Sequence, residues 1–369
     1  MARLEDVCEI LDSKRVPITS KDRISGPYPY YGANGIQDYI ADYIFDDELV
    51  LLAEDGGNFG SKEKPIAYRV SGKCWVNNHA HVLKPLPNID VDYLCYSLMF
   101  YDVSSIVNGA TRQKLTQADM RTMEIPLPTM LEQKSIVNQL NRLVSLITLR
   151  QNQLEKLDEL VKSRFIEMFG EIGTDKFGWG LFKIGDLCII NPKKSDDTRL
   201  SSELDVSFVP MPAVSEHGDI DTSETRKYDE VKTGFTYFAD DDVLFAKITP
   251  CMENGKGCVA RHLCNGIGFG STEFHVLRPT NKVNSVWVYA VTSFPKFRED
   301  AANNMTGSAG QRRVPAVFLE HYKITLPPIE LQEQFAAFVE QTDKSKLAVQ
   351  KSLGQLETLK KSLMQKYFG

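Results

Sequence analysis

The sequence has no long apolar run, no cysteine framework and no excess of positive charge. None of its apolar stretches approaches the roughly 18 uninterrupted residues of a transmembrane helix, so none is predicted. Residues 1–6 contain no apolar signal core, and we expect no export. The 7 cysteines are odd in number and irregularly spaced, which is typical of a protein in the reducing cytoplasm.

The charge balance limits the kinds of partner that the chain can bind. Its 43 Lys and Arg and 49 Asp and Glu give a net charge of −6. This argues against a protein that coats nucleic acid non-specifically, because such a protein needs a large positive field. A DNA reader with a locally basic face remains open, as does an assembly whose other subunits carry positive charge. The length of 369 residues predicts two or three domains.

Motifs of the common DNA-acting enzymes are missing. The nearest match to the Asn/Asp-Pro-Pro-aromatic motif of amine methyltransferases is Asn191-Pro192-Lys193-Lys194. The Gly-rich segment 56–62 has the wrong order for a nucleotide-binding phosphate loop, and we interpret it as a tight hairpin or a close backbone approach to a ligand. The string Gly-Ile-Gly-Phe-Gly at 266–270 has no helix pattern after it, so we expect a loop and not a dinucleotide site.

Candidate metal and acid clusters are weak. His79 and His81 would share one face of a strand, but no third ligand is evident. Asp221 and Glu230 with Lys232 could be arranged as a nuclease centre, but such spacings arise often by chance among 49 acidic residues. We therefore predict no metal site and no catalytic centre in this chain.

The chain repeats itself. Four pairs of segments match: Asp6-Val7-Cys8 with Asp186-Leu187-Cys188, residues 81–85 with 275–279, residues 125–128 with 324–327, and Phe169-Gly170 with Phe368-Gly369. The offsets are 180, 194, 199 and 199, so the first part of each half carries insertions. The closing segment is therefore a module of fixed length that is used twice.

Each closing segment is predicted to be a long helix. Residues 131–169 contain neither Gly nor Pro, and apolar residues recur in alternating steps of four and three, which is a heptad seam. The copy over 332–368 is weaker, because Gly354 lies inside it and Thr342, Lys346 and Lys360 occupy seam positions. About 38 residues at about 1.5 Å per residue would make a rod of roughly 57 Å.

An exposed apolar stripe on a long helix must be covered, and the nearest suitable partner is the second copy of the same helix. Two copies of one unit form a pseudo-twofold pair, which makes the helices antiparallel. The alternative is that each helix packs only on its own globular half. The predicted helix-pair interface comprises Ile136, Leu140, Leu143, Ile147, Leu154, Leu157, Val161, Phe335, Val339, Val349, Leu353, Leu356 and Leu363. We expect the helix pair to set the distance between whatever the two halves bind.

The globular halves are predicted to be irregular α+β domains with a substantial β component. Short apolar runs at 49–53 and 243–246 are bounded by Gly, Asn and Asp, which is typical of strands and turns. The predicted division of the chain is 1–125 for the first domain, 126–170 for the first helical region, 171–325 for the second domain and 326–369 for the second helical region.

Several loops combine Gly, amide and basic residues, the types that contact base edges and phosphates. The loops at 109–114 and 307–313 both lie just before a helical module, and this matched position favours binding over an ordinary turn. Two such domains on a rigid spacer can read two separated sequences along one duplex. The candidate DNA-binding residues are Tyr31, Asn34, Lys62, Arg112, Gln113 and Lys114 in the first half, and Lys193, Lys194, Lys247, Asn254, Lys256, Thr272, Glu273, Gln311, Arg312 and Arg313 in the second.

Short segments throughout the chain are similar to sequence motifs of one known family. They are residues 30–35 and 53–56 in the first half, 245–256 and 270–279 in the second, and Ile125-Pro126-Leu127-Pro128 followed by Leu131-Glu132-Gln133. Together with the order of globular half and long helix, used twice, they resemble the specificity subunit of Type I restriction–modification systems. The resemblance covers nearly the whole chain.

The resemblance implies two similar α/β target-recognition domains separated by a long antiparallel two-helix coiled coil, and a bipartite site on double-stranded DNA. It implies a complex with two modification subunits that methylate adenine using S-adenosylmethionine, and with restriction subunits that use ATP and cleave. Those cofactors, and Mg²⁺, belong to the partners, and none is expected on this chain. We therefore predict a non-catalytic, cytoplasmic DNA-specificity subunit.

Two other functions stay open at this point. The first is a nuclease or methyltransferase with unrecognised motifs, which would act alone when given S-adenosylmethionine or Mg²⁺. The second is a purely protein-binding scaffold, without which a modification complex would still bind its specific DNA.

Overall fold

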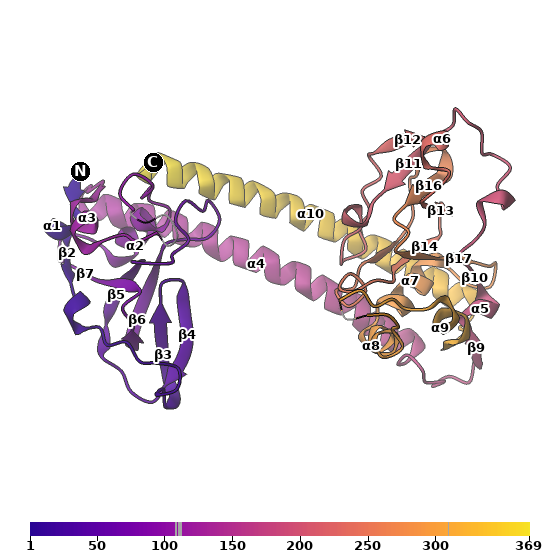
Figure 1. The fold of residues 1–369 in the computed structure, drawn as a ribbon, viewed down its shortest axis with the longest axis horizontal. Coiled ribbons are helices and arrows are strands. Elements are labelled where there is room, and N and C mark those ends of the chain that lie inside the picture. Colours follow the sequence, from indigo (N-terminus) through magenta and orange to yellow (C-terminus); the bar gives the residue numbers. More distant parts are fainter. Residues whose placement is uncertain (108, 110–112, 309) are drawn as a thin grey trace. The chain divides into compact units, whose positions relative to one another are not determined.

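The computed structural model describes residues 1–107, 109, 113–308 and 310–369 (Figure 1). By its contacts the chain divides into two units, the first formed by Met1–Asn152 with Gln350–Gly369 and the second by Gln153–Val349. Each unit contains a globular part of mixed helix and sheet, as predicted, and one end of each of two long helices. These helices are α4 (Met130–Phe169) and α10 (Ile329–Phe368). No helix of the described residues is long and apolar enough to cross a membrane.

The first unit is built on a six-stranded sheet of order β2-β7-β5-β6-β3-β4, with β1 and β8 forming a separate two-stranded sheet. The predicted strand at 49–53 is the buried end of β5, and its alternate residues enter two different hydrophobic clusters on the two faces of the sheet. The elements are β1 (Ala2–Arg3), α1 (Leu4–Val7), β2 (Cys8–Ile10), η1 (Asp12–Lys14), β3 (Ser25–Gly32), β4 (Gly35–Ile40), β5 (Phe45–Ala53), β6 (Ala67–Val76), β7 (Ala80–Pro85), α2 (Val91–Met99), α3 (Gln117–Thr122) and β8 (Glu124–Ile125).

The second unit has two four-stranded sheets, of order β10-β17-β14-β15 and β12-β11-β16-β13, and a two-stranded sheet of β18 and β9. Its elements are β9 (Leu181–Lys183), α5 (Ile184–Leu187), β10 (Cys188–Ile190), η2 (Lys194–Asp196), β11 (Asp205–Val209), η3 (Met211–Ala213), β12 (Thr225–Lys227), α6 (Tyr228–Val231), β13 (Thr236–Ala239), β14 (Val243–Ala246), β15 (Gly257–Val259), η4 (Cys264–Gly266), β16 (Ile267–Gly270), β17 (Phe274–Pro279), α7 (Ser285–Ser293), α8 (Pro295–Asn303), α9 (Ala316–His321) and β18 (Lys323–Thr325).

The internal repeat is a repeat of sheet order. The series β2-β7-β5-β6 of the first unit corresponds to β10-β17-β14-β15 of the second, and the pair β1-β8 corresponds to β9-β18. The register also matches, because Cys8 faces Pro85 across β2 and β7 and Cys188 faces Pro279 across β10 and β17. The sheet β12-β11-β16-β13 is additional to this shared part. The growth of the offset from 180 to 194 falls in the part of the second unit that contains this sheet, and the growth from 194 to 199 falls after β17.

Four residues of the glycine string at 266–270 form the buried strand β16 (Ile267–Gly270), and not the expected loop, while Gly266 ends η4. This prediction is wrong because the glycines reflect close packing of neighbouring chain segments. A Cβ added at Gly268 would collide with the ring of Phe238, and one added at Gly270 would collide with the carbonyl oxygen of Val209. Glycine inside a strand marks such a close approach as readily as it marks a turn.

Within the second unit, the ends of α4 and α10 pack antiparallel. The ring of Phe335 lies 5.5 Å from the rings of both Phe165 and Phe169, measured between centroids. Further along, Asp158 of α4 pairs with Lys346 of α10, with 2.6 Å between oxygen and nitrogen. From the first contact to the second, the residue number falls along α4, from Phe165 to Asp158, and rises along α10, from Phe335 to Lys346. The two helices therefore run in opposite directions. The ion pair also explains how a lysine occupies a seam position.

Within the first unit, the start of α4 and the end of α10 share one hydrophobic cluster with α2. The hydroxyl of Tyr367 donates a hydrogen bond of 3.2 Å to Oε1 of Gln139. The predicted interface residues are all buried or half-buried, whereas Leu131, Leu149 and Leu160, which lie off the seam, are exposed.

A buried glutamine ties the start of each long helix to its globular part. Gln332 is completely buried, and its Oε1 accepts from the backbone N–H of Asn284 at 2.8 Å. Its Nε2 donates to the carbonyl oxygens of Pro327 at 2.8 Å and Lys282 at 3.3 Å. Gln133 makes the corresponding contacts in the first unit, where it accepts from Asp90 at 2.8 Å. The side-chain amide therefore satisfies three buried backbone groups at each junction.

Replacing Gln332 by leucine is expected to lower the free energy of unfolding by about 2–3 kcal/mol, because these backbone groups lose their partners in a site closed to water. Urea unfolding of the full chain measures the loss. Gln334→Leu is the matched control, since Gln334 is exposed on the same helix and should change the free energy by less than about 0.5 kcal/mol. Equal effects of the two substitutions would contradict this role of Gln332.

Candidate nucleic-acid interface

Three loops of the second unit meet in space, and we call them the second loop cluster. They are residues 247–256, 271–273, and 306–308 with 310–313. The backbone N–H of Lys247 donates to the carbonyl of Glu273 at 2.9 Å, and that of Thr249 donates to the carbonyl of Arg312 at 3.1 Å. Most of the candidate residues predicted for the second half therefore lie together, although Lys247 and Arg313 are 66 positions apart in the sequence.

Ion pairs hold the arginines of this cluster. Both oxygens of Glu273 bind Arg313, at 2.9 Å to Nε and 2.8 Å to Nη2. This bidentate bond lowers the pKa of Glu273 below its usual value. Arg312 pairs with Glu253 at 3.2 Å, and the side chains of Arg312 and Arg313 remain 44% and 41% exposed. The two guanidinium groups are thus oriented by carboxylates and still accessible to a ligand.

The remaining candidates of the second unit differ in their surroundings. Lys247 is half-buried, and burial lowers its pKa. Gln311, Asn254 and Thr272 are exposed. The ammonium group of Lys256 lies 3.4 Å from the carbonyl oxygen of Met211.

The two candidates before strand β11 lie elsewhere in the second unit. Lys193 is exposed at the start of η2. Lys194 donates to the backbone carbonyl of Lys232, which is outside the second loop cluster.

Loops of the first unit form a matching group, the first loop cluster, at residues 31–34, 54–62 and 113–114. Nδ2 of Asn34 donates to the carbonyl of Gly56 at 3.0 Å, and the N–H of Gly56 donates to the carbonyl of Gln113 at 3.3 Å. Lys114 pairs with Glu54 at 3.0 Å.

Three candidates of the first half complete its description. Tyr31 is half-buried at the end of β3, and its ring centroid lies 5.8 Å from that of Tyr68. Lys62 is exposed in the loop after β5. Arg112 lies outside the described residues.

A buried histidine anchors each cluster to its sheet. Nε2 of His81 lies 3.0 Å from the carbonyl oxygen of Leu115, and Nε2 of His275 lies 2.8 Å from that of Val314. Leu115 and Val314 directly follow the last candidate residue of each cluster. The sequence repeat includes both histidines, and the structure shows that they fix the backbone from which Lys114 and Arg313 project.

The partner of each histidine was missed in the sequence, because it is not the same residue type. Asp12 accepts from the N–H of Val82 at 2.9 Å, and Asn191 accepts from the N–H of Val276 at 3.0 Å. Both also contact Nδ1 of the histidine, Asp12 at 2.7 Å and Asn191 at 3.1 Å. Their positions in the sequence could have revealed them, because each closely follows one of two matching strands. Asp12 lies two residues after the end of β2, and Asn191 lies one residue after the end of β10.

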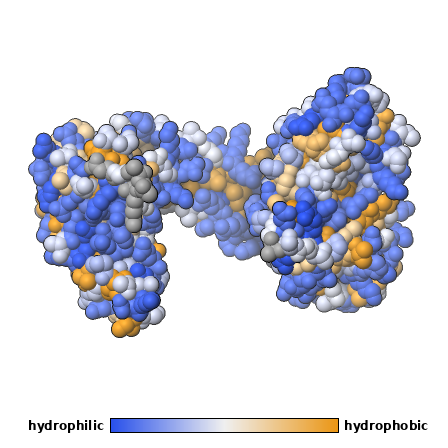
Figure 2. All heavy atoms as spheres, viewed as in Figure 1, coloured by the Kyte–Doolittle hydropathy of each residue, from blue (hydrophilic) through white to orange (hydrophobic). Residues whose placement is uncertain are grey.

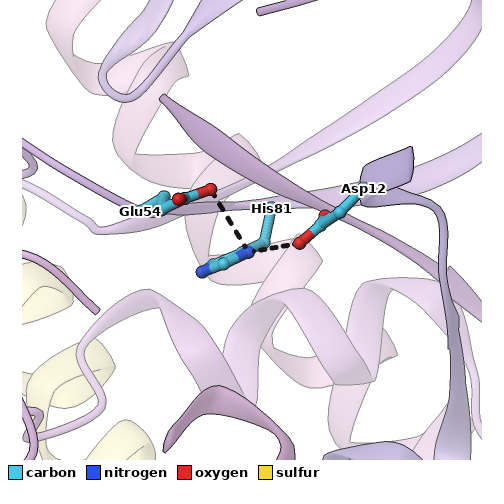
Figure 3. Close-up of side chains that lie close together, drawn as sticks. All are labelled: Asp12, Glu54 and His81. Atoms are coloured by element: carbon cyan, nitrogen blue, oxygen red, sulfur yellow. Dashed lines mark hydrogen bonds and ion pairs between the residues drawn. The ribbon is translucent and has the colours of Figure 1, made fainter. Parts of the chain in front are cut away.

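In the first unit, Asp12, Glu54 and His81 point toward one another (Figure 3), with one ligand atom from each within 4.8 Å of the others. Arg15 binds Glu54 at 2.5 Å and Asp12 at 3.5 Å, and Lys114 also binds Glu54. Burial raises the pKa values of both carboxyl groups, but hydrogen bonds from His81 to Asp12 and from Arg15 to Glu54 outweigh it and keep them low. Two cations thus neutralise the carboxylates, and the arrangement is a buried ion-pair network. His79 lies apart from it and pairs with Asp55 at 2.5 Å.

The visible face of each unit is mostly hydrophilic, with small apolar patches between polar residues (Figure 2). Polar and charged groups on fixed loops can contact phosphates and base edges. In both loop clusters, ion pairs and backbone hydrogen bonds hold polar and charged side chains in place.

The sequence matches the family model of the Type I restriction modification DNA specificity domain over residues 1–159 and again over 177–360. The chain therefore belongs to this family, as the resemblance indicated.

Known relatives match it over different lengths. It is 42% identical over 155 residues to the Type I restriction enzyme EcoEI specificity subunit of Escherichia coli, which covers 41% of this chain and 25% of that protein. The EcoAI specificity subunit of the same species is 42% identical over 161 residues, or 42% of this chain and 26% of that protein. The chain thus spans about a quarter of the length of these two relatives. The Type I restriction enzyme MjaVIII specificity subunit of Methanocaldococcus jannaschii is 22% identical over 99% of this chain and 90% of its own.

Two solved structures share the fold. The S subunit of a Type I restriction–modification system from M. genitalium superposes with a TM-score of 0.58 at 14% identity, and covers 100% of this chain and 95% of its own. The second is a chain from a structure that describes complex assembly and conformational transition of the type I R-M system. It superposes with a TM-score of 0.55 at 17% identity, and covers 100% of this chain and 96% of its own.

Proposed function

We propose that this chain is the DNA-specificity subunit of a Type I restriction–modification complex. Each unit reads one half-site of a bipartite target on double-stranded DNA, through its own loop cluster. The observation that carries the proposal is the repeat of this arrangement. In both units a histidine-anchored backbone presents a basic side chain, Lys114 or Arg313, next to a carboxylate. Family membership supports DNA as the ligand.

The chemistry of the complex is assigned to partner subunits. Two modification subunits would methylate adenine with S-adenosylmethionine, and restriction subunits would use ATP and Mg²⁺ to cleave. The motifs for these reactions are missing from the sequence, which supports a non-catalytic chain. The role of this chain is then to hold the modification subunits at a chosen sequence.

The purified chain alone is expected neither to methylate nor to cleave DNA. Adding the modification subunit and S-adenosylmethionine should produce methylation at bipartite sites, mapped by sequencing the modified adenines. The control is the modification subunit without this chain, which should give no site preference. Robust turnover by the chain alone would favour the enzyme alternative, and unchanged site preference without the chain would favour the scaffold alternative.

The double variant Arg312→Ala, Arg313→Ala should weaken DNA binding by the assembled complex. A lost bidentate base contact costs about 1–3 kcal/mol and relaxes preference at one position of the second half-site. A lost phosphate contact weakens binding to all sequences alike and reduces the salt slope by about 1. Titrations at several salt concentrations separate the two cases.

Lys344→Ala, Lys351→Ala is the matched control for this double variant, because it removes the same charge from exposed positions of α10. If affinity and salt slope were the same for wild type, control and double variant, the two arginines would not contact DNA.

A further inference from the structure

Helix α8 contains an arginine that lies inside the second unit. Arg298 is only 7% exposed. Its Nε donates to the carbonyl of Thr292 at 2.7 Å. Its Nη1 donates to Met252 at 3.0 Å and Lys256 at 3.3 Å, and its Nη2 donates to Gly255 at 3.2 Å and Lys256 at 3.4 Å. All five N–H groups of the guanidinium can be satisfied by these five bonds, and every acceptor is a backbone carbonyl.

This charge is buried without a carboxylate. Among the described residues, no acidic side chain forms an ion pair with Arg298, and burial lowers its pKa to about 10. Burying a cation is costly unless other groups replace its lost hydration. Here the carbonyls do so, and one of them is in the last turn of α7, where the helix dipole favours a cation. The guanidinium also lies 4.5 Å from the centre of the Phe245 ring.

The carbonyls that Arg298 binds belong mainly to one loop, residues 252–256, which is part of the second loop cluster. From inside, the guanidinium holds three of the five backbone carbonyls of this segment. From outside, Glu253 of the same loop pairs with Arg312, and Asn254 is exposed. The loop is thus fixed on its inner side, while its outer side carries candidate contact residues. A Cβ added at Gly257 would lie only 3.2 Å from Nη2 of Arg298, so the packing leaves little freedom.

We propose that Arg298 is a positioning residue for sequence recognition by the second unit, holding the 252–256 backbone so that Glu253, Asn254 and, through Glu253, Arg312 face the DNA. The inference rests on the proposed function, since it assigns a role within that recognition surface. A planar guanidinium with five donors suits this task, whereas lysine offers three donors from one nitrogen and cannot reach all the carbonyls. The first unit has no counterpart of α8 among its described elements, so the device is particular to the second half-site.

A purely structural role would look different, and the same unit provides a comparison. Arg278 binds Asp242 bidentately, at 2.8 Å and 2.7 Å. This pair lies at the beginning of β14, whereas the 247–256 loop follows the end of that strand. Loss of the Arg278 pair should destabilise the unit without moving the loop.

The test uses the complex assembled with modification subunits, carrying Arg298→Lys or, as the matched control, Arg278→Lys. Methylation rates are measured on the cognate site and on sites with single substitutions in either half-site. In Arg298→Lys, the ratio of cognate to substituted rates should fall at least tenfold for the second half-site and stay unchanged for the first. In Arg278→Lys both ratios should stay unchanged, even if the melting temperature falls.

An unchanged second half-site ratio in Arg298→Lys, or an equal fall in Arg278→Lys, would overturn the inference. A wild-type complex with no half-site preference would instead overturn the proposed function. Should Arg298→Lys not fold, hydrogen exchange of the wild-type complex decides. The amides of Asn254, Gly255 and Lys256, which donate to carbonyls at 2.9 to 3.0 Å within the loop, should exchange as slowly as those of β14. Exchange at the rate of exposed loops would show that the loop is not held and would overturn the inference.

Discussion

Exchanging residues 171–325 for the equivalent segment of another such subunit is expected to replace the second half-site and leave the first unchanged. The segment lies wholly inside the second unit, which has its own hydrophobic clusters and contains the whole second loop cluster. The first loop cluster is built from residues of the first unit only. Each mismatched base pair costs about 1–3 kcal/mol, so binding to the original site should fall by several orders of magnitude when several base pairs change.

Mapping of methylated adenines in DNA exposed to the exchanged complex measures this result. The reciprocal exchange of residues 1–125 is the control, and it should alter the other half-site. A melting curve of each hybrid separates loss of recognition from loss of folding, since Phe165, Phe169 and Phe335 must still pack on the exchanged domain. Simultaneous change of both half-sites would show that the units do not read independently.

Asp12→Ala should destabilise the first unit by about 3–5 kcal/mol, the usual effect of removing one member of a buried charged network. The carboxylate is 8% exposed and receives hydrogen bonds from His81 at 2.7 Å and from Gln117 at 2.9 Å. Removing it leaves Arg15 with half of its carboxylate partners. Urea unfolding at pH 7 measures the effect, and Asp42→Ala, at an exposed position, is the control with an expected change below about 0.5 kcal/mol.

Asp12→Asn should cost less than the alanine substitution, about 1–2 kcal/mol, because asparagine can still accept from Val82. The second unit shows this solution, since Asn191 accepts from Val276 at the matching position. If the asparagine variant were as unstable as the alanine variant, the charge of Asp12 and not its hydrogen-bonding shape would be the main contribution.

A pH dependence of stability is also expected, and it can be measured by comparing wild type with Asp12→Asn. Despite its burial, the pKa of Asp12 is lowered by hydrogen bonds from His81, Gln117 and the Val82 N–H. The resulting stabilisation is fully present above the unfolded-state pKa of about 4 and is lost as the pH falls through the lower folded-state pKa. The free energy of unfolding of wild type should therefore fall more steeply below about pH 4 than that of Asp12→Asn. Parallel curves would contradict this contribution of Asp12.

The sequence predicts the layout better than it predicts the site. Heptad spacing and the constant offset of 199 identify the long helices, which begin at Met130 and Ile329, one and three residues before the predicted starts. The candidate loops could be named because they are rich in Gly and basic residues. Which of these loops lie together depends on the pairing of strands that are far apart in the sequence, such as β14 with β17. The local spacing of residues contains no information about this pairing. The role of the helix pair in setting the spacer stays a prediction.

Other features could not be predicted from the sequence, because the role of each residue depends on partners that only the tertiary structure brings near. Arg298 stands in a polar helix segment and looks like an ordinary surface residue until the 252–256 loop covers it. Asp12 and Asn191 are equivalent in space but differ in chemical type, so a repeat search by residue identity passes over them. The glycines of β16 are explained only by Phe238 and Val209, which no local pattern connects to them.

The division of the chain also sets an order for folding during synthesis. Residues 153–349 are contiguous and can complete the second unit as they leave the ribosome, but the first unit needs residues 350–369, which are made after all of them. Until then Tyr93 and Leu140 lack the cover of Leu363 and Phe368, which pack against the same cluster. The part that is translated first is therefore finished last, and its unfinished core is the surface that a chaperone would have to protect.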